Sequence, residues 1–162
     1  MSSDPADAAL SELSPGDVGP MSRLHTKAFP DGQGWRPAEF ESLLRQDSTH
    51  AYALLSDGAL ATFGVFQSVV DQVEILTLAT DPDHRRKGLA RRLLSALEPQ
   101  FLNAGLKTWL LDVAEDNPGA ITFYQTLGFT TDGRRPRYYK RLEGKRVDAI
   151  LMSKPMARQV VR

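Results

Sequence analysis

The stretch from Val73 to Val113 constrains the fold more than any other part of this chain. It contains a β-like run over Val73–Thr80 and a nearly continuous apolar run over Thr108–Val113. Between these runs, apolar residues recur at the spacing of one helix face, which predicts a helix from Gly88 to about Ala104. That face consists of Leu89, Leu93, Leu94, Leu97 and Phe101. A strand, a helix and a strand in this order form a right-handed crossover, so the sheet should contain a parallel pair.

The residues before this crossover predict two helices and a hairpin. A serine followed by a proline, with a carboxylate two residues later, is typical of a helix start and opens a helix from Ser14 to about Ala28. A second helix begins at Arg36-Pro37. Two β-like runs then follow, Ala51–Leu55 and Ala61–Val70, joined by the hairpin turn Ser56-Asp57-Gly58.

The residues after the crossover predict one more helix and a final hairpin. Asn117-Pro118 supplies a helix cap and a first helical residue, and Gly128 suits the end of that helix. The hairpin comprises Phe129–Tyr139 and Val147–Met152. Within the long central helix, Pro99 removes a backbone donor, so we expect a kink or a split there.

The expected order is a strand, two helices, three strands, a helix, a strand, a helix and two strands. This order defines an α/β fold with a mixed, mostly antiparallel sheet of about six to seven strands, a central parallel pair and about four helices. With 162 residues, 41% of them hydrophobic, the chain is long enough to bury one core. We expect a mobile lead over residues 1–7, a single domain over 8–156 and a tail over 157–162.

Composition excludes several classes of function. Twenty basic and twenty acidic side chains cancel, which argues against a surface built for nucleic acid, so we expect no direct DNA binding. The absence of cysteine and the presence of three histidines leave no disulfide, no thiolate nucleophile and no expected metal site. No apolar run approaches the roughly 18 residues of a membrane span. We therefore predict a cytoplasmic protein without membrane contact, either a monomer or a weak dimer.

A group of cations precedes the long helix. Arg85, Arg86 and Lys87 lie at its N-terminal end, where the helix dipole disfavours each cation by about 0.3 to 1 kcal/mol. A bound anion would offset this repulsion, and Gly88 lets a ligand approach the first backbone amides closely. The alternative is a solvated helix face. Because the dipole argues against that alternative, we favour a phosphate-binding cradle.

Two motifs in this region resemble those of the GNAT acetyltransferases. Arg85-x-x-Gly88-x-Ala90, after a strand, is similar to the acyl-CoA-binding motif [QR]xxGx[GA] of that superfamily. The second motif, N-x-x-A-x-x-x-Y-x-x-x-G-F, is matched without a gap from Asn117 to Phe129. Over about Leu10 to Met156, the chain further resembles the RimI-type ribosomal-protein alanine N-acetyltransferases. That finer resemblance rests on Ala28-Phe29-Pro30, Trp109–Val113, Ala120–Phe129, Tyr138-Tyr139 and Asp148–Met152.

The resemblance implies that acetyl-CoA is the co-substrate and that it is held at two places. The pyrophosphate would lie on the loop and helix start formed by Arg85, Arg86, Lys87, Gly88, Leu89, Ala90 and Arg91. The pantetheine arm would lie between the splayed parallel strands, against the backbone of Leu78, Ala79 and Thr80, for which an ordinary core strand is the alternative. Asn117 would also contact the cofactor, a role that can coexist with capping its helix.

Tyr124 and Asp112 are the first two candidates for proton transfer. Tyr124 resembles the general acid that protonates the departing thiolate, and the alternative is a tyrosine of the amphipathic core. Asp112 matches the general-base glutamate of RimI-type enzymes but is one methylene shorter. Strand alternation places it with Leu110 and Ala114 in a strand expected to be apolar on both sides, where an unpaired carboxylate is costly.

Glu74 is the rival base. It is expected on the same strand face as Leu76 and Leu78, and carboxylates at the start of this strand serve as bases in several GNAT branches. We favour Asp112, while the two carboxylates on neighbouring strands can also share the task.

The acceptor is the least constrained part of the prediction. The resemblance implies transfer to the N-terminal amine of a protein, such as a ribosomal protein, and Trp35 and Tyr138 are candidate substrate-binding residues. The alternatives are a small amine (a polyamine, an aminoglycoside or an amino acid), for which the cleft lacks an acidic cluster, and a non-catalytic acyl-CoA-binding module. A second basic cluster follows on the last hairpin: Arg134, Arg135, Arg137, Lys140, Arg141, Lys145 and Arg146. We favour a solvated face for it over contact with RNA or an acidic substrate.

Overall fold

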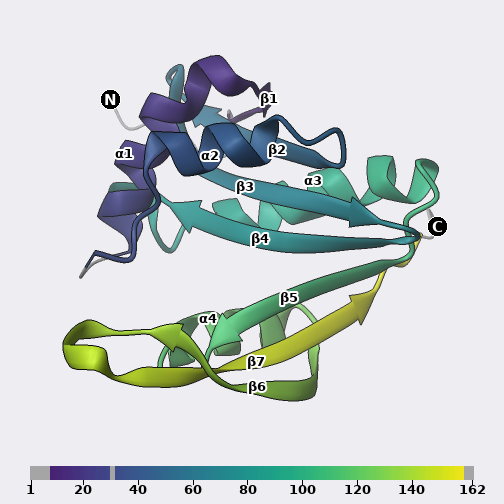
Figure 1. The fold of residues 1–162 in the computed structure, drawn as a ribbon. Coiled ribbons are helices and arrows are strands. Elements are labelled where there is room, and N and C mark those ends of the chain that lie inside the picture. The colour runs from purple at the N-terminus through teal and green to yellow at the C-terminus, as the bar shows by residue number, and fades with distance from the viewer. Residues whose placement is uncertain (1–7, 30–31, 159–162) are drawn as a thin grey trace.

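The computed structural model of the protein describes residues 8–29 and 32–158, so the expected mobile lead over 1–7 lies outside the described residues. The strands form one sheet in the order β1-β2-β3-β4-β5-β7-β6 (Figure 1). They are β1 Ala9–Leu13, β2 Thr49–Ser56, β3 Ala59–Val69, β4 Gln72–Thr80, β5 Thr108–Ala114, β6 Thr130–Lys140 and β7 Arg146–Pro155. The helices are α1 Val18–Ala28, α2 Pro37–Leu44, α3 Leu89–Asn103 and α4 Pro118–Thr126, with short 3₁₀ turns η2 Pro15–Asp17, η3 Pro82–His84 and η4 Leu142–Gly144.

The predicted crossover and mixed sheet are confirmed. β4 and β5 are the parallel pair, and α3 connects them. All other neighbouring strands pair antiparallel. The turn between β2 and β3 has positive φ at Asp57 and Gly58, 53° and 78°, as a two-residue hairpin turn requires.

Two local predictions about the helices were wrong. The first helix was expected to begin near Pro15, but Pro15–Asp17 forms the 3₁₀ turn η2 and α1 begins at Val18. Pro99 was expected to kink or split α3, and the split did not occur, because α3 continues without a break from Leu89 to Asn103. Pro99 and Ser95, one turn earlier, are both exposed, so water can hydrate the carbonyl that the missing N–H leaves free.

The sheet separates two hydrophobic cores. The α3/α4 core gathers the apolar faces of α3 and α4 with residues such as Phe66, Trp109 and Met152. The α1/α2 core lies on the other face and is centred on Met21, Phe40 and Phe63. None of the helices in the described part of the chain is both long enough and apolar enough to cross a membrane.

The two parallel strands are joined at one end only. Their ladder covers Gln72–Ile75 of β4 and Thr108–Leu111 of β5. Beyond that ladder the strands diverge toward the carboxyl end of β4, as Figure 1 shows. The sheet thus provides an open strand edge on each side of a wedge-shaped gap.

A bulge interrupts β4 where this divergence starts. Val65 of β3 lies opposite Thr77, and Phe66 lies opposite Ile75, so Leu76 is an extra residue in β4. The bulge reverses the alternation of side chains, because Leu76 packs on the α1/α2 core and Leu78 on the α3/α4 core. The expectation that Leu78 shares a strand face with Leu76 was therefore wrong.

Candidate active site

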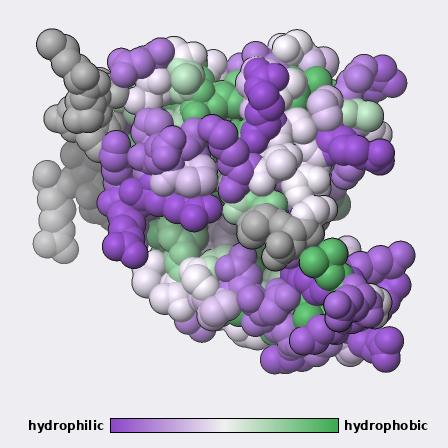
Figure 2. All heavy atoms as spheres, turned by 90° about the vertical axis from the view of Figure 1, so that its left-hand side faces the viewer, coloured by the Kyte–Doolittle hydropathy of each residue, from purple (hydrophilic) through white to green (hydrophobic). Residues whose placement is uncertain are grey.

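Two segments that are distant in the sequence flank the open end of the gap between β4 and β5. In Figure 1, the segment that leads into α2 approaches this end from one side, and the β6–β7 hairpin extends toward it from the other. Figure 2 views this end and shows hydrophobic atoms at the base of a hollow, with hydrophilic side chains around it. The predicted catalytic residues lie on the elements that border this gap.

The loop before α3 has the backbone of an anion cradle. Gly88 is the N-cap of α3 and has φ of 70°, a conformation that glycine adopts without strain. The first hydrogen bond of the helix runs from the Arg92 N–H to the Gly88 carbonyl, at 3.0 Å. The amides of the three residues between them, Leu89, Ala90 and Arg91, therefore remain available to a ligand.

The cations of this loop carry no neutralising partner of their own. The side chains of Arg85, Arg86 and Lys87 are exposed, and no carboxylate of the described residues forms an ion pair with them. Arg85 instead donates to the carbonyl of Ala28 at the end of α1, at 3.4 Å. The positive charge at the helix start is thus left for a bound anion.

Along the edge of β4 that borders the gap, every second residue points its backbone N–H and C=O groups into the gap. The Asp81 N–H donates to Ala61 on β3 at 2.8 Å, and the carbonyl of Ala79 accepts from the Thr62 hydroxyl of β3 at 3.0 Å. Since backbone groups of a strand alternate in direction, those of Leu78 and Thr80 face the gap. Of the three residues predicted to hold the pantetheine arm, Ala79 therefore points its carbonyl away from the gap.

Tyr124 lies on α4 with its ring buried beside Phe129, at a centroid distance of 5.3 Å. Burial, followed by the proximity of Tyr139, raises its pKa well above the usual value. No described side chain forms a hydrogen bond with its hydroxyl. At the start of the same helix, Asn117 accepts from the Ala120 N–H at 3.1 Å, which confirms its predicted role as a cap.

Glu74 and Asp112 interact across the parallel pair. Glu74 lies opposite Leu110 in the ladder, and Asp112 follows on the same face of β5. The pKa of Glu74 is raised, first by burial and then by the negative charge of Asp112, while Arg135 opposes the shift. Asp112 itself forms an ion pair with Arg135, at 3.6 Å between Oδ2 and Nε. The face of β5 that carries Asp112 is half-exposed, so the expectation of a strand apolar on both sides was wrong.

The two tyrosines of the β6–β7 hairpin differ in their relation to this carboxylate pair: Tyr139 interacts with it, whereas Tyr138 contacts Arg135. Tyr139 is half-buried, and its pKa is raised to about 12 by burial and then by Asp112. Tyr138, the predicted substrate residue, is 51% exposed and lies under the Arg135 guanidinium, 5.7 Å from its ring centroid. A pair of tyrosines in a cationic hairpin was the available signal, but it could not tell which ring points inward.

Three arginines of the hairpin form ion pairs with carboxylates: Arg134, Arg135 and Arg141. The basic cluster on the hairpin is therefore only partly a solvated face. Arg134 contacts Glu115 at 2.7 Å and Asp148 at 3.1 Å. Arg141 donates to both oxygens of Asp116, at 2.8 and 2.9 Å. The hydrogen bond from Arg141 lowers the pKa of Asp116 below its usual value. These pairs hold the hairpin against β5 and the residues that follow it.

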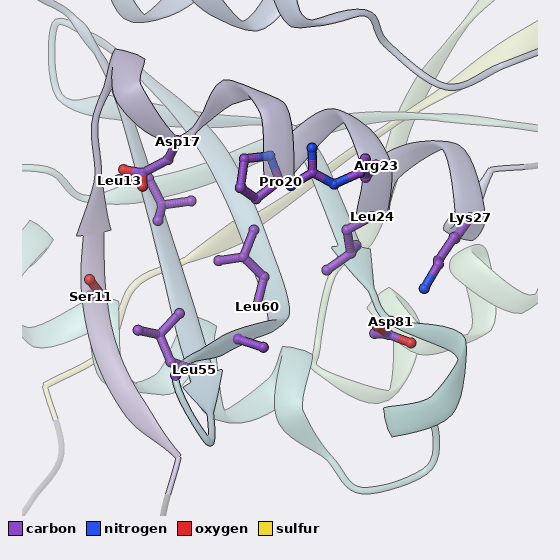
Figure 3. Close-up of a pocket in the computed structure, with 12 residues that line it drawn as sticks. Ser11, Leu13, Asp17, Pro20, Arg23, Leu24, Lys27, Leu55, Leu60 and Asp81 are labelled. Carbon is purple, nitrogen blue, oxygen red and sulfur yellow. The ribbon is translucent and has the colours of Figure 1, made fainter.

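A hollow of about 470 Å³ lies elsewhere on the molecule, and none of the predicted site residues lines it. Figure 3 shows it between β1, α1 and the β2–β3 turn, where Leu13, Leu24 and Leu60 point inward. This hollow is therefore separate from the site at the gap between β4 and β5.

The residues of the gap fit a long anionic thioester. The cradle before α3 suits a pyrophosphate, the unpaired edge of β4 suits an amide-containing arm, and Tyr124 presents a free hydroxyl. The pair Glu74 and Asp112 adds a group with a raised pKa, as a general base requires. The site can therefore bind an acyl thioester and exchange protons with an incoming amine and a leaving thiolate.

Comparisons with known proteins agree with this geometry. The sequence model of the "Acetyltransferase (GNAT) family" matches residues 20–129. The [Ribosomal protein bS18]-alanine N-acetyltransferase of Escherichia coli K12 is 34% identical over 131 residues, which cover 81% of this chain and 80% of that protein. The N-alpha-acetyltransferase RimI of Mycobacterium tuberculosis is 28% identical over 144 residues, which cover 86% of this chain and 89% of that protein. The crystal structure of the ribosomal-protein-S18-alanine N-acetyltransferase from Escherichia coli superposes with a TM-score of 0.83 at 30% identity, covering 94% and 96% of the two chains.

Proposed function

This chain belongs to the GNAT acetyltransferase family and is an acetyl-CoA-dependent N-acetyltransferase, and from this premise we propose that its acceptor is the N-terminal amine of a protein. The observation that carries the proposal is the match to the Escherichia coli enzyme along 94% of this chain, since that enzyme is named for alanine N-acetylation of a ribosomal protein. A ribosomal protein that begins with alanine is the first acceptor to test. We place the activity in the cytoplasm.

Acetyl-CoA supplies the activated acetyl group, and the chain's own residues would hold it along the gap. We assign the pyrophosphate to the free amides of Leu89, Ala90 and Arg91 and to the side chains of Arg86 and Lys87. The pantetheine arm is assigned to the backbone of Leu78 and Thr80, which faces the gap. Arg85 and Asn117 support the site by ordering the loop and capping α4.

The transfer forms a bond between the acceptor nitrogen and the acetyl carbon as the carbon–sulfur bond breaks, so one proton leaves the amine and one joins the thiolate. We assign proton uptake to Glu74, whose raised pKa suits a base, while the charge of Asp112 maintains that shift. Tyr124 is assigned as the donor to the thiolate, because its raised pKa keeps it protonated and its hydroxyl is free. The sequence favoured Asp112 as the base, and we reverse that preference because Asp112 already has an ion-pair partner in Arg135.

Arg135 favours a peptide over a small polycation. Its guanidinium lies beside Asp112 and over Tyr138, on the hairpin that flanks the open end of the gap. A polyamine would bring several positive charges close to this cation, whereas a peptide N-terminus brings one, which must also be lost before the reaction. The exposed ring of Tyr138 then remains as a surface for the first residues of a peptide.

The acceptor is tested by thiol release with short peptides that differ at the N-terminal residue, compared with spermidine and lysine. Because the chain has no cysteine, a thiol reagent reports only released CoA. We expect the highest kcat/KM with an N-terminal alanine peptide. Higher kcat/KM with spermidine or lysine would replace the proposal by a small-amine acetyltransferase.

The base is tested by the pH dependence of kcat/KM in Glu74→Gln and Asp112→Asn. A base with a raised pKa loses function as pH falls through that pKa, so activity should decline toward acid. Glu74→Gln should lower kcat/KM by about 100-fold or more and flatten the decline of activity toward acid pH. Asp112→Asn should lower kcat/KM by a smaller factor. It should also move the decline of activity to lower pH, because it removes a charge that raises the pKa of Glu74. A larger loss in Asp112→Asn would make Asp112 the base.

A further inference from the structure

The backbone of Trp35 is held on both sides by side chains of α1. Its N–H donates to Nδ1 of His25 at 3.0 Å, and its carbonyl accepts from the hydroxyl of Ser22 at 2.7 Å. Both of these side chains are buried, at 2% and 9% exposure. Burying polar groups is costly unless they are bonded, and here two of them satisfy a single loop residue.

His25 also connects this loop to β4. Because Nδ1 accepts a hydrogen bond, the neutral ring carries its proton on Nε2, which donates to the Thr77 hydroxyl at 2.8 Å. Burial lowers the pKa of His25 to about 4, against an opposing effect of Glu39, so the ring is neutral near pH 7. The histidine therefore bridges Trp35 and Thr77 in one fixed tautomer.

Packing fixes the loop against the helix as well. The ring of His25 lies 4.5 Å from that of Phe29 and 5.0 Å from that of Trp35. A Cβ at Gly34 would lie 2.7 Å from Cα of Thr26, so only glycine allows this approach. The segment before α2 is thus pressed onto α1 with little freedom for Trp35.

The position of this bridge relates it to the acceptor rather than to acetyl-CoA. Thr77 directly follows Leu76, the extra residue of β4 at which the two parallel strands begin to diverge. The loop itself flanks the open end of the gap, opposite the β6–β7 hairpin (Figure 1). The cradle for the pyrophosphate lies beyond Thr80, in a different segment.

We propose that His25 is a positioning residue for the acceptor: together with Ser22 it holds Trp35 as one wall of the acceptor site, and through Thr77 it ties that wall to the bulge of β4. This inference rests on the proposed function for the identity of the acceptor, but the hydrogen bonds that it invokes can be tested without catalysis.

Hydrogen exchange at the Trp35 amide, followed by NMR, tests the bridge in the free enzyme. His25→Phe removes the acceptor of that N–H and should speed exchange by about tenfold or more relative to amides in β3. His25→Asn keeps an acceptor near the place of Nδ1 and should retain most of the protection while losing the bond to Thr77. Equal exchange in the wild type and His25→Phe would overturn the inference.

Steady-state kinetics test the consequence, using the acceptor with the highest turnover in the peptide and amine panel. We expect Ser22→Ala and His25→Phe to raise the KM of the acceptor by about fivefold to tenfold and to leave the KM of acetyl-CoA within about twofold. His25→Asn and Thr77→Val should each raise the KM of the acceptor by about threefold, and the double variant should show no further rise.

Thr49→Val is the matched control for Thr77→Val. Thr49 is also a buried strand threonine, but its hydroxyl has no partner among the described residues, so the substitution should leave both KM values unchanged. A loss of kcat without a change in acceptor KM would indicate a merely structural role and overturn the inference. Wild-type turnover only with small amines would instead contradict the proposed function, while the exchange measurement would still decide whether the bridge exists.

Discussion

The chain carries two groups of cationic residues, and they differ in what they face. The cradle group, Arg85, Arg86, Lys87 and Arg91, has no ion pair with a carboxylate of the described residues and surrounds the start of α3. In the hairpin group, Arg134, Arg135 and Arg141 each meet a carboxylate at 3.6 Å or less. Both groups look alike as charge runs in the sequence, but three arginines of the hairpin form ion pairs, whereas none of the cradle cations does so with a carboxylate of the described residues.

The difference has an electrostatic cause. At the start of α3 the cations add to the positive end of the helix dipole, so the local potential remains positive until an anion binds. On the hairpin, Asp148 forms an ion pair with Arg134 and Asp116 forms one with Arg141, and these pairs hold the strands in place. We therefore expect substitutions in the cradle group to change acetyl-CoA binding and substitutions in the hairpin group to change stability.

The largest expected effect comes from placing a negative charge in the cradle. Gly88→Asp and Gly88→Asn have nearly the same shape, both residue types tolerate positive φ, and a Cβ at Gly88 meets no atom within 4 Å. Two charges about 8 Å apart interact by about 2 kcal/mol at an effective dielectric constant of 20. Gly88→Asp should therefore weaken acetyl-CoA binding about 30-fold more than Gly88→Asn, as measured by calorimetry. Equal affinities would show that no anion binds at this helix start.

A smaller effect is expected from removing charge from the cradle group. The double variant Arg86→Ala, Lys87→Ala should weaken acetyl-CoA binding by about tenfold at low salt and by less at 0.5 M salt, since exposed charges are screened. The free energy of unfolding should change by less than about 0.5 kcal/mol, because neither side chain has an ionic partner in the described part of the chain. A comparable loss of stability would erase the distinction between the two groups.

The smallest effect is expected in the hairpin group. Arg141→Ala should lower the free energy of unfolding by about 1 kcal/mol, because it breaks a bidentate but partly exposed pair with Asp116. Chemical denaturation measures this loss, and a double-mutant cycle with Asp116→Asn isolates the pair. Acetyl-CoA affinity should stay unchanged. A drop in that affinity as large as in the cradle variant would contradict the comparison.

Local sequence signals predicted most of the fold because they act over a few residues. The periodicity of Val73–Thr80, the long central helix and Thr108–Val113 gave the crossover, and Ser56-Asp57-Gly58 gave the first hairpin. The errors concern features that depend on surroundings. Pro99 is tolerated because its side of α3 faces solvent, and the bulge at Leu76 is visible only in the register between β3 and β4.

Local signals also selected the segments of the candidate site. The motif from Asn117 to Phe129 and the glycine at the start of α3 identified the family and the segments that border the gap. The environment of each carboxylate could not be predicted, since the pairing of Asp112 with Arg135 joins residues from different strands. Nothing in the sequence distinguished Arg135 from its neighbours, or Tyr139 from Tyr138.

The sequence by itself determined the order of elements, the parallel pair and the cationic helix start, because hydrophobic periodicity, turn residues and helix dipoles are local properties. Only the tertiary structure decided which cations remain unpaired, which carboxylate has a raised pKa and how Trp35 is held by His25. Those outcomes depend on burial and on distances between side chains far apart in the chain, and electrostatic and hydrogen-bond energies change steeply with both.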